Sequence, residues 1–308
     1  MEDKRITKLL RNLDKAVEKI CDKPITVAFS GGIDSTLVAF LSKKYCEVEL
    51  IAVGIPNSHD IRAAKSAAKL INTNLKIIEI EQTEMVSEAL DMQKQLDLSG
   101  IEVEFMLPFW IVAKNASNPI LMCGQGADEL FGGYARFRKE GAKKNLKKEV
   151  KDLIMRIPAR EEKIANIFNL KLSCPYLSKN VIDAAEDFSV DEHIGKIGKI
   201  ILRKVATEFG LPKEITNRKK KAAQYGSGSQ KAIKNIIKHK IQFEIEFENE
   251  KLAKAIAKAT EPENAGWVDT AVNGRQVKAV VKAKNLGSLK EAAEDFMACI
   301  AVAEKVSK

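Results

Sequence analysis

The sequence predicts an α/β fold: a doubly wound parallel sheet with a helical lobe, followed by a small α+β domain. Three observations lead to this prediction. Short apolar segments alternate with helical segments as far as Cys123. Helical patterns then dominate up to about residue 238, and a strand-like alternation of apolar and polar residues begins soon after. Strands that alternate with helices at this spacing are typical of a parallel sheet.

The first domain, residues 1–238, is expected to form the sheet and the lobe. Its strand segments are short and almost wholly apolar, as in a sheet covered on both faces. The predicted strands are Ile25–Phe29, Val48–Val53, Leu75–Ile80 and Pro119–Cys123. The predicted helices are Arg5–Cys21, Leu37–Lys44, Asp60–Leu70, Met85–Leu96 and Pro108–Asn115. From Asp128 to about Lys238 helical patterns dominate, which predicts a helical lobe with a flexible break at Gly226–Ser229.

The second domain, residues 239–308, is expected to follow the order β-α-β-β-α. Its first segment alternates apolar and polar residues, as a half-buried strand does. An Asn-Gly pair between two later strands is a strong hairpin signal. The predicted elements are the strand Ile241–Phe247, the helix Glu250–Ala259, a turn at Pro262–Gly266, the strands Val268–Val272 and Gln276–Ala283, and the helix Leu289–Val306.

Composition favours a cytoplasmic protein. No apolar run reaches the roughly 18 residues that span a bilayer, and Met1–Leu10 is too charged for a secretory signal. The five cysteines are scattered and contain no CxxC pair, so a disulfide framework or zinc ribbon is not expected. We therefore expect no membrane partner and a reducing compartment.

The net charge of +9 is unevenly placed. Residues 241–308 contain 10 basic and 11 acidic residues, so the excess lies on the first domain. It is concentrated in Arg138–Lys151 and Lys213–Lys240. Such a surface suits a polyanion such as ATP or RNA. The alternative is a pair of lysine-rich, solvated helix faces.

A glycine-rich turn, Ser30-Gly-Gly-Ile-Asp-Ser35, lies between a predicted strand and a predicted helix. Gly31 and Gly32 lack a Cβ, so their backbone can approach phosphate oxygens closely. The N–H groups of the turn and the positive end of the helix dipole favour an anion. The hydroxyl groups that can add hydrogen bonds belong to Ser30, Ser35 and Thr36. The turn predicts a phosphate-binding loop that is not a Walker loop, because the chain has no GxxxxGK[ST].

Two aspartates beside glycine-rich strand ends are candidate metal ligands. Asp34 lies within the loop, where a bare carboxylate would repel phosphate but a Mg²⁺ ligand could bridge to it. Asp128 lies in Cys123-Gly-Gln-Gly-Ala-Asp-Glu-Leu-Phe-Gly-Gly-Tyr134, directly after the fourth predicted strand. Either aspartate alone could be a helix N-cap instead. Together they indicate a carboxylate pair gathered on one Mg²⁺.

These motifs resemble the ATP pyrophosphatases with a pyrophosphate loop, which form adenylates and release pyrophosphate. The stretch after the fourth strand is similar to the SGEG[AS]DE[LV]FGGY sequence of asparagine synthetases, and the resemblance covers about residues 24–235. It implies an adenine nucleotide alpha-hydrolase-like fold. It also implies nucleotide contacts at Cys123 and Gly124, an adenine contact at Val53, and magnesium and pyrophosphate held by Asp34 and Asp128.

A third region, Gly198–Lys204 followed by Leu211–Gly226, resembles the asparagine synthetase segment with the basic loop that closes on the active site. The resemblance puts the family's catalytic lysine at Lys220. A lysine there can neutralise charge that develops on the acyl-phosphate oxygens. The alternative is a solvated loop of four adjacent basic residues.

Two departures from the family pattern bear on the nitrogen source. The family's SGEG glutamate is Gln125 here, and an amide cannot take up a proton as a carboxylate can. Only about 24 residues precede the synthetase-like domain, so we expect no glutaminase domain. Ammonia would then come free or from a separate glutaminase partner, or another amine would take its place.

The second domain resembles the small dimerising subunit of the KEOPS tRNA-modification complex. The segments that carry the likeness are Phe247–Ile256 and Ala283–Leu289, followed by a long helix. The resemblance implies a homodimer formed through residues 241–308, or a KEOPS-like partner. The alternative is a generic βαββα cap.

The sequence thus predicts an ATP- and Mg²⁺-dependent ligase that adenylates a carboxylate, releases pyrophosphate and makes an amide with ammonia. Lys220 and Gln125 are the candidate catalytic residues. One alternative is a tRNA-modifying amide synthetase that acts on a carboxylated nucleoside. The other is a non-catalytic nucleotide-binding subunit of a tRNA-modification complex.

Overall fold

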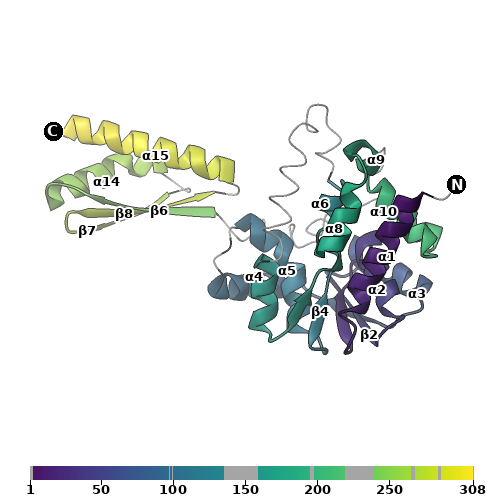
Figure 1. The fold of residues 1–308 in the computed structure, drawn as a ribbon. Helices are drawn as coiled ribbons and strands as arrows, with labels where there is room; N and C mark the ends of the chain where they lie inside the picture. The colour runs from purple at the N-terminus through teal and green to yellow at the C-terminus, as the bar shows by residue number, and fades with distance from the viewer. Residues whose placement is uncertain are drawn as a thin grey trace. The chain divides into compact units, whose positions relative to one another are not determined.

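The computed structural model describes residues 3–96, 98, 100–134, 159–194, 198–218, 239–264, 268–283 and 286–307. The chain divides into two compact units, Met1–Gln230 and Lys231–Lys308 (Figure 1). The predicted domain boundary at residue 238 and the predicted break at Gly226–Ser229 lie outside the described residues. No helix in these ranges has the length and apolar character needed to cross a bilayer.

Parallel strands form the sheet of the first unit, in the order β3-β2-β1-β4-β5. The central strand is β1, whose Ile25 pairs with Val48 on one side and with Ile120 on the other. The strands are β1 (Ile25–Ala28), β2 (Val48–Gly54), β3 (Leu75–Glu79), β4 (Ile120–Met122) and β5 (Lys171–Ser173). The predicted doubly wound parallel sheet is confirmed.

The strand β5 contradicts the prediction that strands end at Cys123. It pairs with β4 in parallel register, so that Leu121 lies beside Leu172. The strand has three residues, and the one at its start is exposed. Such a short edge strand has no apolar run that a sequence pattern could reveal. It is defined by its hydrogen bonds to β4, which only the fold shows.

Helices cover both faces of this sheet. Figure 1 shows α4 and α5 on one side and α2 and α3 on the other, as expected when the chain crosses over twice in each direction. The helices are α1 (Lys4–Glu18), α2 (Ile33–Ser42), α3 (His59–Leu70), α4 (Gln82–Gln95), α5 (Gly100–Lys114), α6 (Ala127–Leu130), α8 (Lys179–Glu186), α9 (Val190–Ile194), α10 (Ile200–Glu208) and α11 (Lys213–Thr216), with a 3₁₀ turn, η3, at Pro175–Leu177.

Helices α2 and α5 begin at least one full turn earlier than predicted. Gly32 is extended and caps α2, so the helix begins at Ile33 instead of Leu37, and Asp34 lies in its first turn. Helix α5 begins at Gly100 and contains Pro108, which was predicted to open the helix. The prediction was wrong because the helix is set by buried apolar positions that extend N-terminal to the proline, although Pro108 removes one helical hydrogen bond and crowds the preceding turn.

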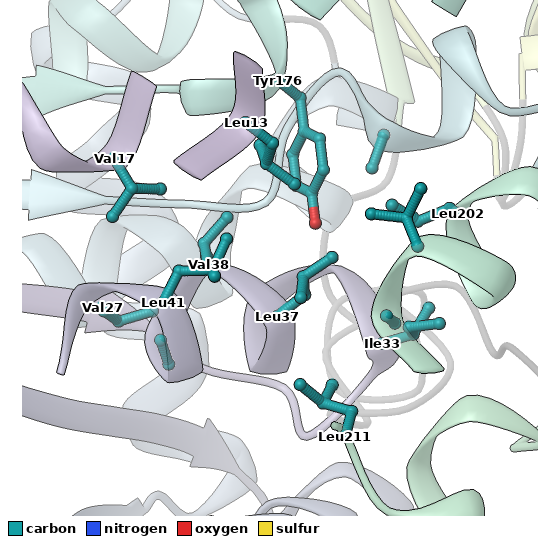
Figure 2. Close-up of a cluster of buried hydrophobic side chains, with 14 of the residues drawn as sticks. Leu13, Val17, Val27, Ile33, Leu37, Val38, Leu41, Tyr176, Leu202 and Leu211 are labelled. Carbon is teal, nitrogen blue, oxygen red and sulfur yellow. The ribbon is translucent and has the colours of Figure 1, made fainter. Parts of the chain in front are cut away.

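The core of the first unit joins the sheet to α1, α2 and α10. Leu13 and Val17 of α1 belong to the same buried cluster as Leu37 and Leu41 of α2, and Figure 2 shows these side chains. Tyr176 is fully buried, and its hydroxyl donates to the carbonyl oxygen of Asp34 at 3.1 Å. The core therefore fixes the first turn of α2 directly.

The described residues of the second unit form a three-stranded antiparallel sheet, in the order β6-β8-β7, packed against two helices. Its elements are β6 (His239–Glu246), α14 (Glu250–Asn264), β7 (Val268–Asn273), β8 (Gln276–Ala283) and α15 (Leu286–Ser307). The predicted βαββα order and the hairpin at Gly274, with φ +57°, are confirmed. The predicted turn from Pro262 is wrong, because α14 continues to Asn264. Dimerisation through this unit stays a prediction.

Candidate active site

The strand order places a crevice at the carboxyl ends of β1 and β4. The chain leaves β1 toward β2 and later returns to the other side of β1 as β4, so the two following loops diverge there. Ligands of open α/β sheets bind at such a switch point. A cavity of about 230 Å³ opens at this place, lined by residues that follow β1, β2 and β4.

The loop after β1 forms one wall of the cavity. Ser30, Gly32, Asp34 and Ser35 line it, as predicted from their sequence positions. Thr36 lies behind the loop, where its hydroxyl donates to the carbonyl of Gly32 at 2.7 Å.

Gly31 shapes this loop. Its φ is +68°, and a Cβ there would lie 2.4 Å from the carbonyl carbon and oxygen of Ala63 in α3. The loop therefore packs on α3 at a distance that only glycine allows.

The segment after β4 forms the facing wall. Cys123, Gly124, Gln125 and Asp128 line the cavity, and Val53 reaches it from the end of β2. Gly124 lies directly against α2, since a Cβ at this position would be 2.8 Å from the Cβ of Asp34. The two predicted nucleotide-binding motifs are therefore adjacent, although about 90 residues separate them.

Asp34 and Asp128 converge on one cation, the ammonium of Lys199. Lys199 Nζ lies 2.5 Å from Asp34 Oδ2 and 2.6 Å from Asp128 Oδ1. The lysine side chain is almost fully buried, whereas the two carboxylates are about one-fifth exposed. Burial lowers the pKa of Lys199, and Asp34 opposes this effect. The two carboxylates thus form a negatively charged site, which the buried ammonium of Lys199 occupies.

Lys199 was not predicted as a site residue. It has φ +57° and immediately precedes α10, and its backbone N–H donates to the carbonyl of Phe131 at 3.1 Å. Its only signal in the sequence was its membership of the third motif, Gly198–Lys204. Among many lysines, one that is buried beside two acids cannot be recognised without the fold.

Two arginines support the loop: Arg218 contacts it directly, and Arg203 contacts Arg218. Arg218 donates to the carbonyl oxygens of Gly31 at 2.7 Å and Ala63 at 3.1 Å. Arg203 donates in turn to the carbonyls of Gly198 and Arg218, each at 3.0 Å. Both line the cavity, and burial lowers the pKa of each guanidinium. The predicted catalytic Lys220 lies outside the described residues, two positions beyond Arg218.

The site fits Mg²⁺ by its donor chemistry. Asp34 Oδ1 is buried and has no hydrogen-bond partner among the residues that the structure describes. No group of three or more His, Cys, Asp or Glu within those residues could hold an ion. Mg²⁺ commonly takes one or two carboxylates and completes its shell with phosphate oxygens and water. Asp34 and Asp128 therefore stay the predicted ligands of the ion, with Asp34 Oδ1 as the oxygen that has no other partner among the described residues.

The parallel sheet, the SGGxDS loop at its switch point and the opposing carboxylates define an adenine-nucleotide-binding synthetase domain of the pyrophosphate-loop class. The family model described as asparagine synthase matches residues 8–157 and 149–270. The chain belongs to the asparagine synthase family.

Curated relatives agree with this assignment. The chain is 34% identical over 277 residues to a Methanocaldococcus jannaschii protein that is assigned by name to the glutamine-hydrolyzing asparagine synthetases, covering 74% of this chain and 48% of the relative. It is 28% identical over 251 residues to asparagine synthetase 2 of Oryza sativa subsp. japonica (71% and 42%). It is 25% identical over 233 residues to asparagine synthetase B of Escherichia coli K12 (67% and 42%). The chain thus spans about half the length, or less, of these relatives.

Gly124→Ala should weaken ATP binding, because the new methyl group must displace the first turn of α2. The added Cβ would also lie 3.0 Å from the backbone nitrogen of Ser35. We expect a loss of about 1–3 kcal/mol in unfolding free energy and a Kd for ATP raised about tenfold, as one lost phosphate hydrogen bond would give. Thermal unfolding and ATP titration measure the two effects.

Gly210→Ala is the matched control. Gly210 has φ +88°, so alanine is strained there, but its Cβ would meet no atom of the described residues within 4 Å. This variant should lose stability while keeping its affinity for ATP. Equal ATP affinity in the Gly124→Ala and Gly210→Ala variants would contradict the close packing of Gly124 on the loop.

Proposed function

We propose that this chain uses ATP to activate the side-chain carboxylate of aspartate as β-aspartyl adenylate and then converts this adenylate to asparagine with ammonia. In the first step a carboxylate oxygen attacks the α-phosphorus, and pyrophosphate leaves. In the second step nitrogen attacks the acyl carbon, the C–O bond to phosphate breaks, and AMP leaves with that electron pair. The convergence of Asp34 and Asp128 on one buried cation beside the SGGxDS loop is the observation that carries this proposal.

The residues have separable roles in this proposal. The backbone N–H groups of the loop, with the hydroxyls of Ser30 and Ser35, bind the phosphates at the N-terminus of α2. Until the ion binds, Lys199 supplies the positive charge between the two carboxylates that would hold it. When bound, Mg²⁺ would neutralise the pyrophosphate oxygens. The nucleotide base is expected at the ends of β2 and β4, against Val53, Cys123 and Gly124. Lys220 is expected to stabilise charge on the acyl phosphate.

Aspartate is proposed as the substrate because the relatives carry the name asparagine synthetase. The charge excess of the first domain supports a second candidate, a carboxylate on a modified tRNA nucleoside. We propose ammonia as the nitrogen donor in both cases, supplied free or by a glutaminase. A reducing, cytoplasmic setting suits the five free cysteines.

The test is exchange of labelled pyrophosphate into ATP, which reports adenylation without any nitrogen donor. Purified protein with ATP and Mg²⁺ is assayed with aspartate, with bulk tRNA, and with neither. We expect exchange that requires aspartate, and asparagine with AMP once ammonium is added. Exchange that requires tRNA would instead support the second candidate, a carboxylate on a tRNA nucleoside, as the substrate. Absence of exchange in every arm would favour a non-catalytic nucleotide-binding subunit.

A further inference from the structure

Gln125 has a buried carboxylate behind it. Its side chain lines the cavity, and its Nε2 donates to Oε1 of Glu161 at 3.0 Å. Residues 159–167 are helical, so Glu161 comes from a segment about 36 positions further along the chain. No sequence motif connects the two residues. The fold therefore brings the carboxylate of Glu161 next to Gln125, the position at which the asparagine synthetase motif SGEG has its glutamate.

Glu161 is held firmly in this place. Its side chain is fully buried, and Arg160 Nη2 donates to the same Oε1 at 3.1 Å. The guanidinium of Arg160 lies 4.7 Å from the centre of the Phe105 ring, and Phe105 itself lines the cavity. Burial raises the pKa of Glu161, while Arg160 opposes that effect. An ion pair of this kind restricts where the carboxylate can point.

The carboxylate decides how the amide of Gln125 is oriented. An ionised carboxylate can only accept hydrogen bonds, so the NH₂ group of Gln125 must face Glu161. The carbonyl oxygen is then the amide atom left to accept a hydrogen bond from a ligand in the cavity. Without Glu161, the amide could rotate by 180° and present its NH₂ group instead.

We infer that Glu161 is a positioning residue for the nitrogen donor, holding Gln125 so that its carbonyl oxygen accepts an N–H from ammonia beside the acyl carbon. This role rests on the proposed function. An ammonia held by its N–H keeps its lone pair free for attack on the adenylate. As the C–N bond forms, the nitrogen becomes positively charged. The negative charge of Glu161, on the far side of the Gln125 amide, stabilises this positive charge. The C–O bond to AMP breaks, and the AMP phosphate takes the proton that nitrogen loses.

Glu161→Gln tests this role by separating the two half-reactions. The variant should keep aspartate-dependent pyrophosphate exchange within about threefold, because adenylation needs no nitrogen. Its KM for ammonia should rise about tenfold or more, as loss of a charge-assisted hydrogen bond predicts. Glu162→Gln, an exposed neighbour on the same helical segment, is the matched control and should leave both values unchanged.

A second variant tests whether Glu161 acts through Gln125. Gln125→Met removes the acceptor oxygen and should raise the KM for ammonia to a similar extent. If Glu161 acts through Gln125, adding Glu161→Gln to Gln125→Met should raise this KM no further. A merely structural Glu161 would instead lower the melting temperature and both half-reactions together.

The outcomes also separate this inference from the proposed function. Normal exchange with an unchanged KM for ammonia in Glu161→Gln would overturn the role of Glu161 alone. A wild-type chain that shows no aspartate-dependent exchange would remove the proposed function, and the role of Glu161 in the nitrogen step with it.

Discussion

Replacing Asp34 by asparagine should lower aspartate-dependent pyrophosphate exchange by about 10²–10³-fold, the usual effect of removing one charge-stabilising group from a reaction centre. Asparagine keeps the size of the side chain and one oxygen, so the variant removes charge with little change in shape. Asp34 lies in the first turn of α2, and its Oδ1 has no hydrogen-bond partner among the described residues. That oxygen is the one most available to a metal ion bound to the phosphates.

Exchange rates at saturating ATP and Mg²⁺ measure this effect, with thermal unfolding to confirm that the variant is folded. Asp22→Asn, at an exposed position outside the cavity, is the control and should behave as wild type. Asp128→Asn should cause a loss of similar size. Because both carboxylates face one cation, the double variant should lose less than the product of the two single losses. Exchange by Asp34→Asn at the wild-type rate would contradict the proposed metal position.

The sequence was sufficient for the fold because its local patterns agree with one another. The apolar segments that became β1, β2, β3 and β4 each end in a turn, and parallel strands must place those turns along one edge of the sheet. The loop at Ser30–Ser35 and the segment after Cys123 therefore had to lie at the same edge. The strand β5 and the start of α5 were missed, because pairing with β4 and burial beside Pro108 depend on contacts that no local pattern encodes.

Only part of the candidate site could be predicted from the sequence. The positions of Asp34 and Gly124 could be expected from motifs, whereas Lys199 reaches Asp34 across 165 residues of sequence. Glu161 and Arg218 likewise act through contacts made only in the folded chain. Lysine and glutamate are mostly exposed in proteins, so their sequence positions alone favour a solvated surface. The roles of the predicted residues, Lys220 among them, stay predictions until the variants are measured.

Lys199→Met should destabilise the protein in the absence of metal and make it respond to Mg²⁺. Removing one partner from a buried ion pair commonly costs about 3–5 kcal/mol, because the opposite charge is left without compensation. Asp34 and Asp128 are about one-fifth exposed, so water can relieve part of this cost. We therefore expect a loss of about 2–3 kcal/mol in unfolding free energy for the metal-free protein.

The response to Mg²⁺ gives the sharper comparison, because it needs neither substrate nor activity. In the wild type, the ion must compete with the Lys199 ammonium for the same two carboxylates, so Mg²⁺ alone should change the melting temperature little. In Lys199→Met the position is open, and an ion that binds only the folded state raises its stability. Lys204→Met, an exposed position in the same helix α10, should show neither effect. An equal Mg²⁺ response in the wild type and in Lys199→Met would mean that the ion and the ammonium do not share a position. The ammonium would then be a structural charge in the core of the domain, and the convergence of the two aspartates would no longer argue for a metal-dependent adenylation site.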